Sequence, residues 1–247
     1  MPITKGSVST KGGRLKKKVI SLYDYTGEMV IPWLKAGFEC FIFDGQHIGH
    51  TSEKVFNGVL HKVEMWFYPT NKTKQASKIK DIVGDGVAIV VGFPPCTDLT
   101  NAGSRHWAKK RAANPNFQKE AMELCLLVEK VGDLYNVPWA FENPVGVLSS
   151  MYRKPDYMFD PKDYGGYLPA NDIHPLYPHV YPPRDAYHKK TCIWMGNGAK
   201  QPDKLPVKEL YKDNPGWKKC GGKSTKTKNI RSCTPRGFAE AFYQKNK

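Results

Sequence analysis

The chain alternates between short, almost wholly apolar runs and longer segments whose apolar positions recur at helical spacing. The short runs end at polar or glycine-containing turns and are too short for helices, so they predict buried strands. Counted with their exit turns, these predicted strands are 19–27, 39–44, 87–93, 138–144 and 189–195.

Three other segments predict helices. Residues 28–38 form an apolar-rich stretch that closes at Gly37. Residues 116–135 carry apolar side chains at positions 121, 124, 127, 128 and 131, the period of a helix with one buried face. Residues 234–244 predict a capped helix with Pro235 near its first turn, where a missing N–H is tolerated.

The remaining segments have no clear period. Residues 45–80 are mixed, with a candidate strand at 62–68, and residues 151–187 are rich in Pro, Tyr and Asp, which predicts a long ordered loop. Residues 196–229 are rich in Gly, Lys and Pro. Because apolar strands alternate with helices, the chain predicts an α/β fold in which a parallel sheet is covered by helices on both faces.

Charge adds the first indication of a partner. Lys and Arg number 38 against 23 Asp and Glu, a net charge of +15 that favours a polyanion. The excess is clustered at 11–18, 71–80, 106–111 and 217–231. A surface that merely keeps the protein soluble is the alternative interpretation.

Composition excludes several other classes. The apolar fraction of 40% supports a sizeable core, and no apolar run is long enough for a transmembrane helix. The first 18 residues lack the apolar centre of a secretion signal, so we expect a soluble, cytoplasmic protein. The six cysteines form no CxxC pair, and the spacing of Cys192, Cys220 and Cys233 matches no zinc module, so we expect no metal.

Polar clusters follow four of the predicted strands, at 24–28, 44–46, 94–98 and 142–144. In an open parallel sheet, ligands bind beyond the carboxyl ends of the strands, at the switch point of strand order. A glycine-bearing turn lets backbone amides face a ligand, and an acid after the second strand suits a ribose diol. Each cluster alone is equally consistent with an ordinary turn.

Cys96 follows a buried strand and two prolines, where a helix could begin. A helix N-terminus and nearby Lys or Arg would lower the pKa of the thiol, although a buried structural cysteine is the alternative. Glu142 ends another strand and is followed by Asn143 and Pro144. A partly dehydrated carboxyl near a thiolate tends to a raised pKa and can carry a proton at neutral pH. The pair suggests covalent addition to an electron-poor ring.

With these residues in view, the chain resembles the cytosine-C5 DNA methyltransferases, specifically the short kind carried by bacteriophages. Pro-Cys followed by Glu-Asn-Pro about 45 residues later is the specific combination. The similar stretches keep the family's order and cover nearly the whole chain from about residue 20 to 242: "LYDYTGEMVIPWLKAGF", "FD" at 43–44, "GFPPCTDLTNAGSRHW", "FENPVGVLS", "DYGG" at 163–166, "KKTCIWM" and "TPRGFAEAF".

The resemblance implies a Rossmann-like, seven-stranded sheet and methyl transfer from S-adenosylmethionine to C5 of cytosine in DNA. By that analogy Cys96 attacks C6, Glu142 hydrogen-bonds or protonates N3, and Asn143 holds Glu142. In duplex DNA the target base must leave the stack to reach the thiolate. The cofactor residues implied are Asp24, Tyr25, Thr26, Gly27, Glu28, Met29, Asp44, Gly45, Pro94, Ser232 and Thr234.

The implied organisation has four parts: a flexible basic arm at 1–17, a catalytic domain at 18–195, a small basic recognition or linker segment at 196–230, and a C-terminal helix at 231–247 that completes the catalytic domain. The expected partner is DNA. We expect the protein to be monomeric and not to associate with a membrane. The residues expected to contact DNA are Arg105, Lys109, Lys110, Arg184, Lys189, Lys218 and Lys219.

The chain departs from the family at several points. Tyr25 and Met29 stand where smaller residues are common, and the arginine cluster near the base has no clean match, with Arg184 or the pair at 189–190 as candidates. Only about 35 residues separate "CIWM" from "NIRSC" and replace a recognition domain. Such a segment can grip phosphates but offers few side chains to read base edges, so we predict weak or very short sequence specificity.

Three alternatives stay open at this stage. The same chemistry could act on single-stranded DNA, RNA or a free cytidine nucleotide, although a small substrate would not need four basic segments. The transferred group could come from an S-adenosylmethionine derivative. The protein could also be a catalytically degenerate DNA-binding protein. For the enzyme, masking phage DNA from host restriction is a role that suits low specificity.

Overall fold

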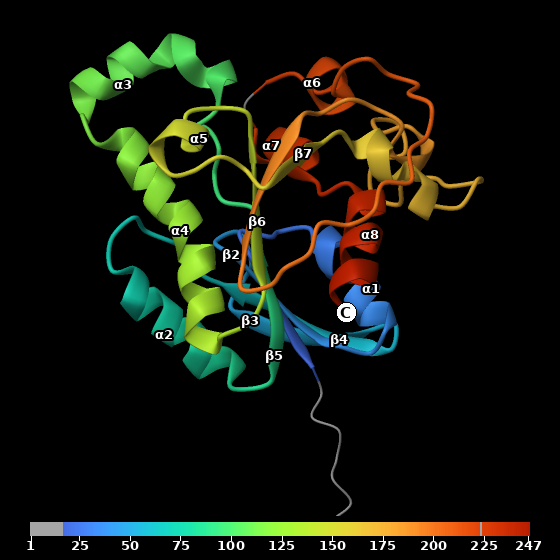
Figure 1. Ribbon diagram of the computed structural model, residues 1–247, viewed down its shortest axis with the longest axis horizontal. Helices are drawn as coiled ribbons and strands as arrows, with labels where there is room; N and C mark the ends of the chain where they lie inside the picture. Colours follow the sequence, from blue (N-terminus) through green and yellow to red (C-terminus); the bar gives the residue numbers. More distant parts are fainter. Residues whose placement is uncertain (1–16, 223) are drawn as a thin grey trace, which may run out of the picture.

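The computed structural model describes residues 17–222 and 224–247 (Figure 1). The predicted basic arm at 1–17 therefore lies outside the described residues, except for Lys17. The strands are β1 (Lys18–Leu22), β2 (Glu39–Asp44), β3 (His50–Val55), β4 (Gly58–Glu64), β5 (Val87–Gly92), β6 (Trp139–Pro144), β7 (Tyr157–Phe159) and β8 (Thr191–Gly196). The α-helices are α1 (Ile31–Lys35), α2 (Lys72–Val83), α3 (Trp107–Ala113), α4 (Phe117–Tyr135), α5 (Leu148–Met151), α6 (Pro215–Lys219), α7 (Thr225–Ser232) and α8 (Arg236–Asn246). Short 3-10 helices are η1 (Glu28–Val30), η2 (Asn101–His106), η3 (Pro161–Tyr167) and η4 (Pro183–Asp185).

One eight-stranded sheet forms the centre of the molecule, with strand order β3-β4-β2-β1-β5-β6-β8-β7. The five strands β4, β2, β1, β5 and β6 are parallel, whereas β3 and β8 are antiparallel to their neighbours. The chain places β2 and β4 on one side of β1 and then crosses over to β5 on the other. The strand order therefore reverses between β1 and β5, where a crevice opens beyond the carboxyl ends of the strands.

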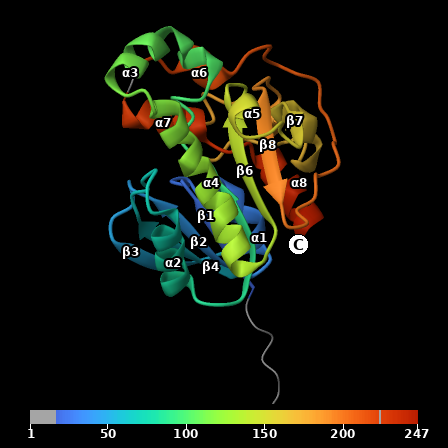
Figure 2. The ribbon, with the colours of Figure 1, turned by 60° about the vertical axis from the view of Figure 1, so that its left-hand side comes forward.

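Helices cover both faces of the sheet. In Figures 1 and 2, α2 and α4 lie against one face, and α1 and α8 lie against the other. Alternate residues of each strand serve the two layers. Ile20 and Leu22 belong to the core beneath α2 and α4, whereas Val19 packs with Trp33 of α1 and Phe242 of α8. The predicted α/β fold with helices on both faces is confirmed.

The predicted parallel sheet is present as five adjacent parallel strands, but the predicted number of seven strands is wrong, because the sheet has eight strands and includes antiparallel pairs. β3 escaped the sequence pattern because this edge strand is largely exposed and polar. β7 has only three residues, too few for a recognisable strand pattern within the predicted loop at 151–187. The direction of β8 was missed because an apolar run marks burial and carries no information about strand direction.

The three predicted helices are present as η1 with α1, α4 and α8. Several shorter ones were missed. α2 begins in the segment 45–80, which has no clear period, and α3 lies beyond the turn that follows Cys96. α6 lies within 196–229, whereas α7 begins in that segment and ends at Ser232. Along the described ranges, no helix combines the length and apolar character needed to cross a membrane.

Candidate functional site

The turn after β1 is built around Asp24. One carboxylate oxygen of this buried side chain accepts the backbone N–H of Gly27 at 2.7 Å, and the other accepts the hydroxyl of Ser21 at 2.7 Å. Gly27 has φ of +72°, a left-handed conformation that favours glycine, and it begins η1. Asp24 therefore holds the turn that precedes η1, whose first residue is the buried Glu28.

The turn after β2 lies against the turn after β1. Asp44 accepts the backbone N–H of Gln46 at 2.8 Å, and Nε2 of His47 lies 3.1 Å from the carbonyl oxygen of Asp24. The ring of Tyr25 stacks on His47 with centroids 5.5 Å apart. A Cβ on Gly45 would lie 2.3 Å from the ring of Trp66, so the indole packs directly over this glycine. These contacts bring the first two polar clusters together at one edge of the sheet.

A buried charge cluster lies behind these turns. Arg236 of α8 forms a two-pronged ion pair with Asp172, with nitrogen–oxygen distances of 2.7 and 2.6 Å, and a carboxylate oxygen of Asp185 lies 3.9 Å away. Burial raises the pKa of Glu28 to about 7, although the charge of Arg236 opposes this shift. Glu28 therefore changes charge near neutral pH beside this buried charge cluster.

The turns after β5 and β6 are joined by hydrogen bonds. The side-chain amide of Asn143, which is completely buried, donates to the carbonyl of Pro94 at 3.2 Å. The N–H of Val147 donates to the carbonyl of Leu99 at 2.9 Å. A Cβ on Gly146 would lie 1.9 Å from that same carbonyl oxygen. Cys96 and Glu142, which sit on these two turns, are thereby held in fixed relation.

Cys96, Glu142 and Lys189 form one electrostatic group. Burial raises the pKa of Glu142, and the charge of Lys189 opposes this shift. Burial and then the Glu142 carboxylate raise the pKa of the half-buried Cys96 thiol, again opposed by Lys189. The expected lowering of the thiol pKa by a helix N-terminus is wrong, because Cys96 is followed by a turn and the next helical residue is Asn101.

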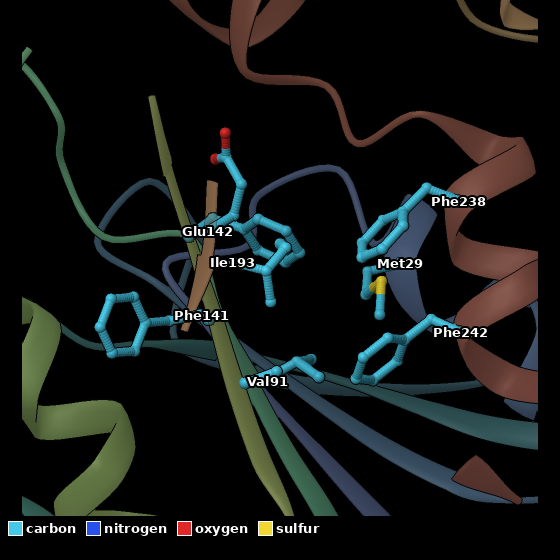
Figure 3. A pocket seen from close by; sticks show the side chains of 10 residues that line it. Met29, Val91, Phe141, Glu142, Ile193, Phe238 and Phe242 are labelled. Carbon is cyan, nitrogen blue, oxygen red and sulfur yellow. The ribbon is translucent and has the colours of Figure 1, made fainter. Parts of the chain in front are cut away.

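Two adjacent hollows meet at Glu142. The first lies between the sheet and α8, and Figure 3 shows the Glu142 carboxylate pointing away from Met29, Phe238 and Phe242, which line it. The second has a polar wall on one side. Its lining residues are Phe93, Glu142, Phe159, Lys189, Thr191, Ser232, Thr234, Pro235 and Phe238.

The basic residues expected on the DNA-binding face have varied surroundings. Arg105 and Lys109 are exposed on η2 and α3, whereas Lys110 pairs with Asp98. Arg184 donates its Nε to the carbonyl of Gly165 at 3.2 Å. Lys189 lines the second hollow beside Glu142.

The two lysines of α6 make local contacts. Lys218 pairs with Asp213 at 2.5 Å, and Lys219 contacts the hydroxyl of Tyr211 at 3.1 Å.

Sequence reasoning named most of the polar residues at this edge but missed three features. Lys189 was assigned to DNA contact and not to the charge balance of Glu142. The apolar walls Phe93, Phe159 and Phe238 were not singled out, since aromatic residues in strands and helices look like ordinary core. Gly146 gave a usable signal, because a glycine directly after Glu-Asn-Pro-Val suggests a close backbone approach.

The site has no group of three or more His, Cys, Asp or Glu side chains that could hold a metal, and neither does any other part of residues 17–222 and 224–247. No protein-family model matches the chain, and no curated protein does either. Among solved structures, the chain is similar to a candidate DNA modification methyltransferase encoded within a prophage of E. coli, with 15% identity and a TM-score of 0.37 over 72% of this chain. The chain spans 46% of the length of that structure. A likeness of that degree assigns neither a fold nor an activity, so function has to be argued from the residues of the chain itself.

Proposed function

We propose that this protein transfers a methyl group from S-adenosylmethionine to C5 of cytosine in DNA. The observation that supports this most is the joined pair of turns after β5 and β6. They join a thiol and a carboxyl that form one electrostatic group with Lys189, and Glu142 lines two adjacent hollows. Covalent addition to an electron-poor ring needs a nucleophile and a proton donor of this kind.

Cys96 supplies the nucleophile. Its sulfur forms a bond to C6 of cytosine, and the electron pair of the C5–C6 double bond is drawn toward N3, where Glu142 delivers a proton. Burial favours the protonated form of Glu142 by raising its pKa. Because the Glu142 carboxylate is one cause of the raised pKa of Cys96, the thiolate is more accessible when Glu142 carries its proton. The electron-rich C5 would then bond to the methyl group, and the electron pair of the broken S–CH3 bond would stay on the sulfur of the donor. Loss of the C5 proton to solvent re-forms the C5–C6 double bond as the bond from C6 to sulfur breaks, so Cys96 leaves as a thiolate and Glu142 recovers its proton from N3.

Residues at the other side of the crevice fit a cationic cofactor with a ribose. Glu28 and Asp44 bring carboxylates to the ends of β1 and β2, and Met29 with Phe242 supplies an apolar wall. S-adenosylmethionine, when bound, supplies a methyl group on a positively charged sulfonium. Acidic side chains complement that charge, and an acid after the second strand suits the ribose diol. Ser232 and Thr234 close the crevice near Glu142.

DNA is the substrate that the charge distribution favours. Figure 1 shows α3 and α6 at the end of the molecule that lies beyond the carboxyl ends of the parallel strands. Arg105 and Lys109 are exposed on η2 and α3, and Lys218 and Lys219 are exposed on α6. A polyanionic chain that crosses between them would present its bases to Cys96 and Glu142.

Covalent trapping tests this proposal. A DNA oligonucleotide that contains 5-fluorocytosine cannot lose a proton from C5, so the bond between sulfur and C6 should persist. We expect an increase in protein mass by one oligonucleotide in the presence of S-adenosylmethionine. The adduct should disappear in Cys96→Ala and persist in Cys220→Ala, the other half-buried cysteine. An adduct that survives in Cys96→Ala would exclude the assigned nucleophile.

A further inference from the structure

An exposed tryptophan with a cation beneath its ring lies on the small basic segment. Trp217 of α6 is 59% exposed, although it is the kind of side chain that folding normally buries. The guanidinium carbon of Arg231, at the end of α7, lies 4.4 Å from the ring centroid. One face of the indole is therefore occupied by a cation, while much of the side chain is open to solvent.

Arg231 is fixed in this position by the backbone of α6. Its Nε donates to the carbonyl of Gly216 at 3.3 Å, and a terminal nitrogen donates to the carbonyl of Cys220. Tyr181 fixes the neighbouring chain by donating its hydroxyl to the carbonyl of Ile230 at 2.6 Å. The indole and the guanidinium thus form a preorganised platform, which lowers the entropy lost when a ligand binds to it.

The platform adjoins the catalytic hollow. Ser232, the residue after Arg231, lines the hollow that contains Glu142. The Nζ of Lys189, which lines the same hollow, lies 3.5 Å from the carbonyl oxygen of Arg231. One extended ligand could therefore stack one group on Trp217 and place another group in the hollow.

The positive charge around the platform favours a polyanionic ligand, and the exposed indole favours one that also has flat, uncharged groups. The sequence has no acidic residue between Asp213 and Glu240, while lysines recur on both α6 and α7. Nucleic acids combine a phosphate chain with neutral aromatic faces, and base–aromatic stacking is a common mode of single-strand binding. Within an intact duplex both faces of each base are covered by its neighbours, so an internal base pair has no face to offer Trp217.

We propose that Trp217, backed by Arg231, is a stacking site for an unpaired nucleobase next to the target cytosine, and that single-stranded DNA is accordingly the preferred form of the substrate. The identity of the nucleic acid as DNA rests on the proposed function. The stacking site itself rests on the geometry of α6 and α7.

The test is a comparison of binding to a short single-stranded DNA of mixed sequence and to its perfect duplex, by anisotropy of a labelled strand without cofactor. We expect tighter binding of the single strand, a loss of about ten-fold or more in Trp217→Ala, and a smaller loss in Trp217→Phe, which keeps a ring. The matched control is Phe56→Ala, because Phe56 is also exposed beneath a cation, Lys35, but lies in the β3–β4 turn at the opposite edge of the sheet. Unchanged thermal unfolding of Trp217→Ala would exclude a folding defect, since its side chain is exposed.

Equal binding of the single strand by Trp217→Ala and by the unsubstituted protein would overturn the proposal, as would tighter binding of the duplex. Because binding is measured without turnover, its outcome is separate from that of the chemistry. Loss of the 5-fluorocytosine adduct with Trp217-dependent binding intact would contradict methyl transfer and leave the stacking site standing.

Discussion

At the scale of single residues, the site is governed by where protons reside. Burial favours the neutral forms of both Cys96 and Glu142, and the positive charge of Lys189 opposes both pKa shifts. In its neutral form, the Cys96 thiol reacts slowly with stray electrophiles. The thiolate is favoured once Glu142 is neutral, because the Glu142 carboxylate then no longer raises the pKa of Cys96. Lys189 therefore influences the protonation of both Cys96 and Glu142, and its effect on the pKa of Cys96 can be measured directly.

Replacement of Lys189 by Met should raise the pKa of Cys96 further, because the opposing positive charge is lost. The measurement is the pH dependence of Cys96 alkylation by iodoacetamide, followed by peptide mass spectrometry. Glu142→Gln should move the midpoint in the opposite direction, since the carboxylate raises the thiol pKa. Lys190→Ala, which removes an exposed lysine paired with Asp160, should leave the midpoint unchanged. Identical profiles for all four proteins would refute the coupling.

Glu28 should make stability depend on pH. Its folded-state pKa of about 7 lies above its ordinary value of 4.5, so the folded protein holds this proton more tightly than the unfolded chain does. The stability from protonated Glu28 is present below about pH 4.5 and is lost as pH rises through about 7. Glu28→Gln should therefore be more stable than the unsubstituted protein above about pH 7, by roughly 2 to 3 kcal/mol, with no gain near pH 4.5. Urea unfolding across this range measures the difference, and a gain that does not vary with pH would contradict the assigned cause.

At the scale of elements, the decisive feature is the contact between the turns after β5 and β6. Asn143 bonds to Pro94, and Gly146 lies against the carbonyl of Leu99 without space for a side chain. Neither contact lies within a single helix or strand, since each joins the segment after β5 to the segment at the end of β6. The two turns reach their geometry because β5 and β6 are paired in the sheet.

Gly146→Ala should separate these turns, because the added Cβ would lie far inside the contact distance of a backbone oxygen. A displacement of about 1 Å at a reacting group can reduce a rate by about a hundred-fold. We expect such a loss of methyl transfer, measured with radiolabelled S-adenosylmethionine. Gly221→Ala is the matched control, since a Cβ there meets nothing within 4 Å. Equal rates for both variants would show that the turn contact does not position the reacting groups.

The sequence predicted the elements that are buried and periodic, and missed those that are not. α4 appears within one residue of its predicted start, because its apolar side chains repeat at helical spacing. β3 and α3 were missed because they carry mostly exposed residues. The Cys96–Glu142 association could be anticipated from two strand ends, whereas the place of Lys189 depends on β8 running antiparallel to β6.

At the scale of the whole molecule, positive charge on η2, α3 and α6 should make DNA binding strongly dependent on salt. The double variant Arg105→Ala with Lys109→Ala removes two exposed charges near α3. The slope of log affinity against log salt should fall in magnitude by about 1.4 to 1.8, or roughly 0.7 to 0.9 for each lost phosphate contact. Lys35→Ala with Lys54→Ala, at the opposite edge of the sheet, should leave the slope unchanged. If both double variants lower the slope equally, the charge acts without a defined binding face.

The proposed function depends on Cys96 as the nucleophile in methyl transfer to cytosine. The most direct measurement is mass spectrometry of nucleosides after incubation of the pure protein with S-adenosylmethionine and mixed-sequence DNA, single-stranded and duplex, beside Cys96→Ala. We predict 5-methylcytosine with the unsubstituted protein and none with Cys96→Ala. No modified cytosine on either form of DNA, or equal amounts with Cys96→Ala, would contradict the account.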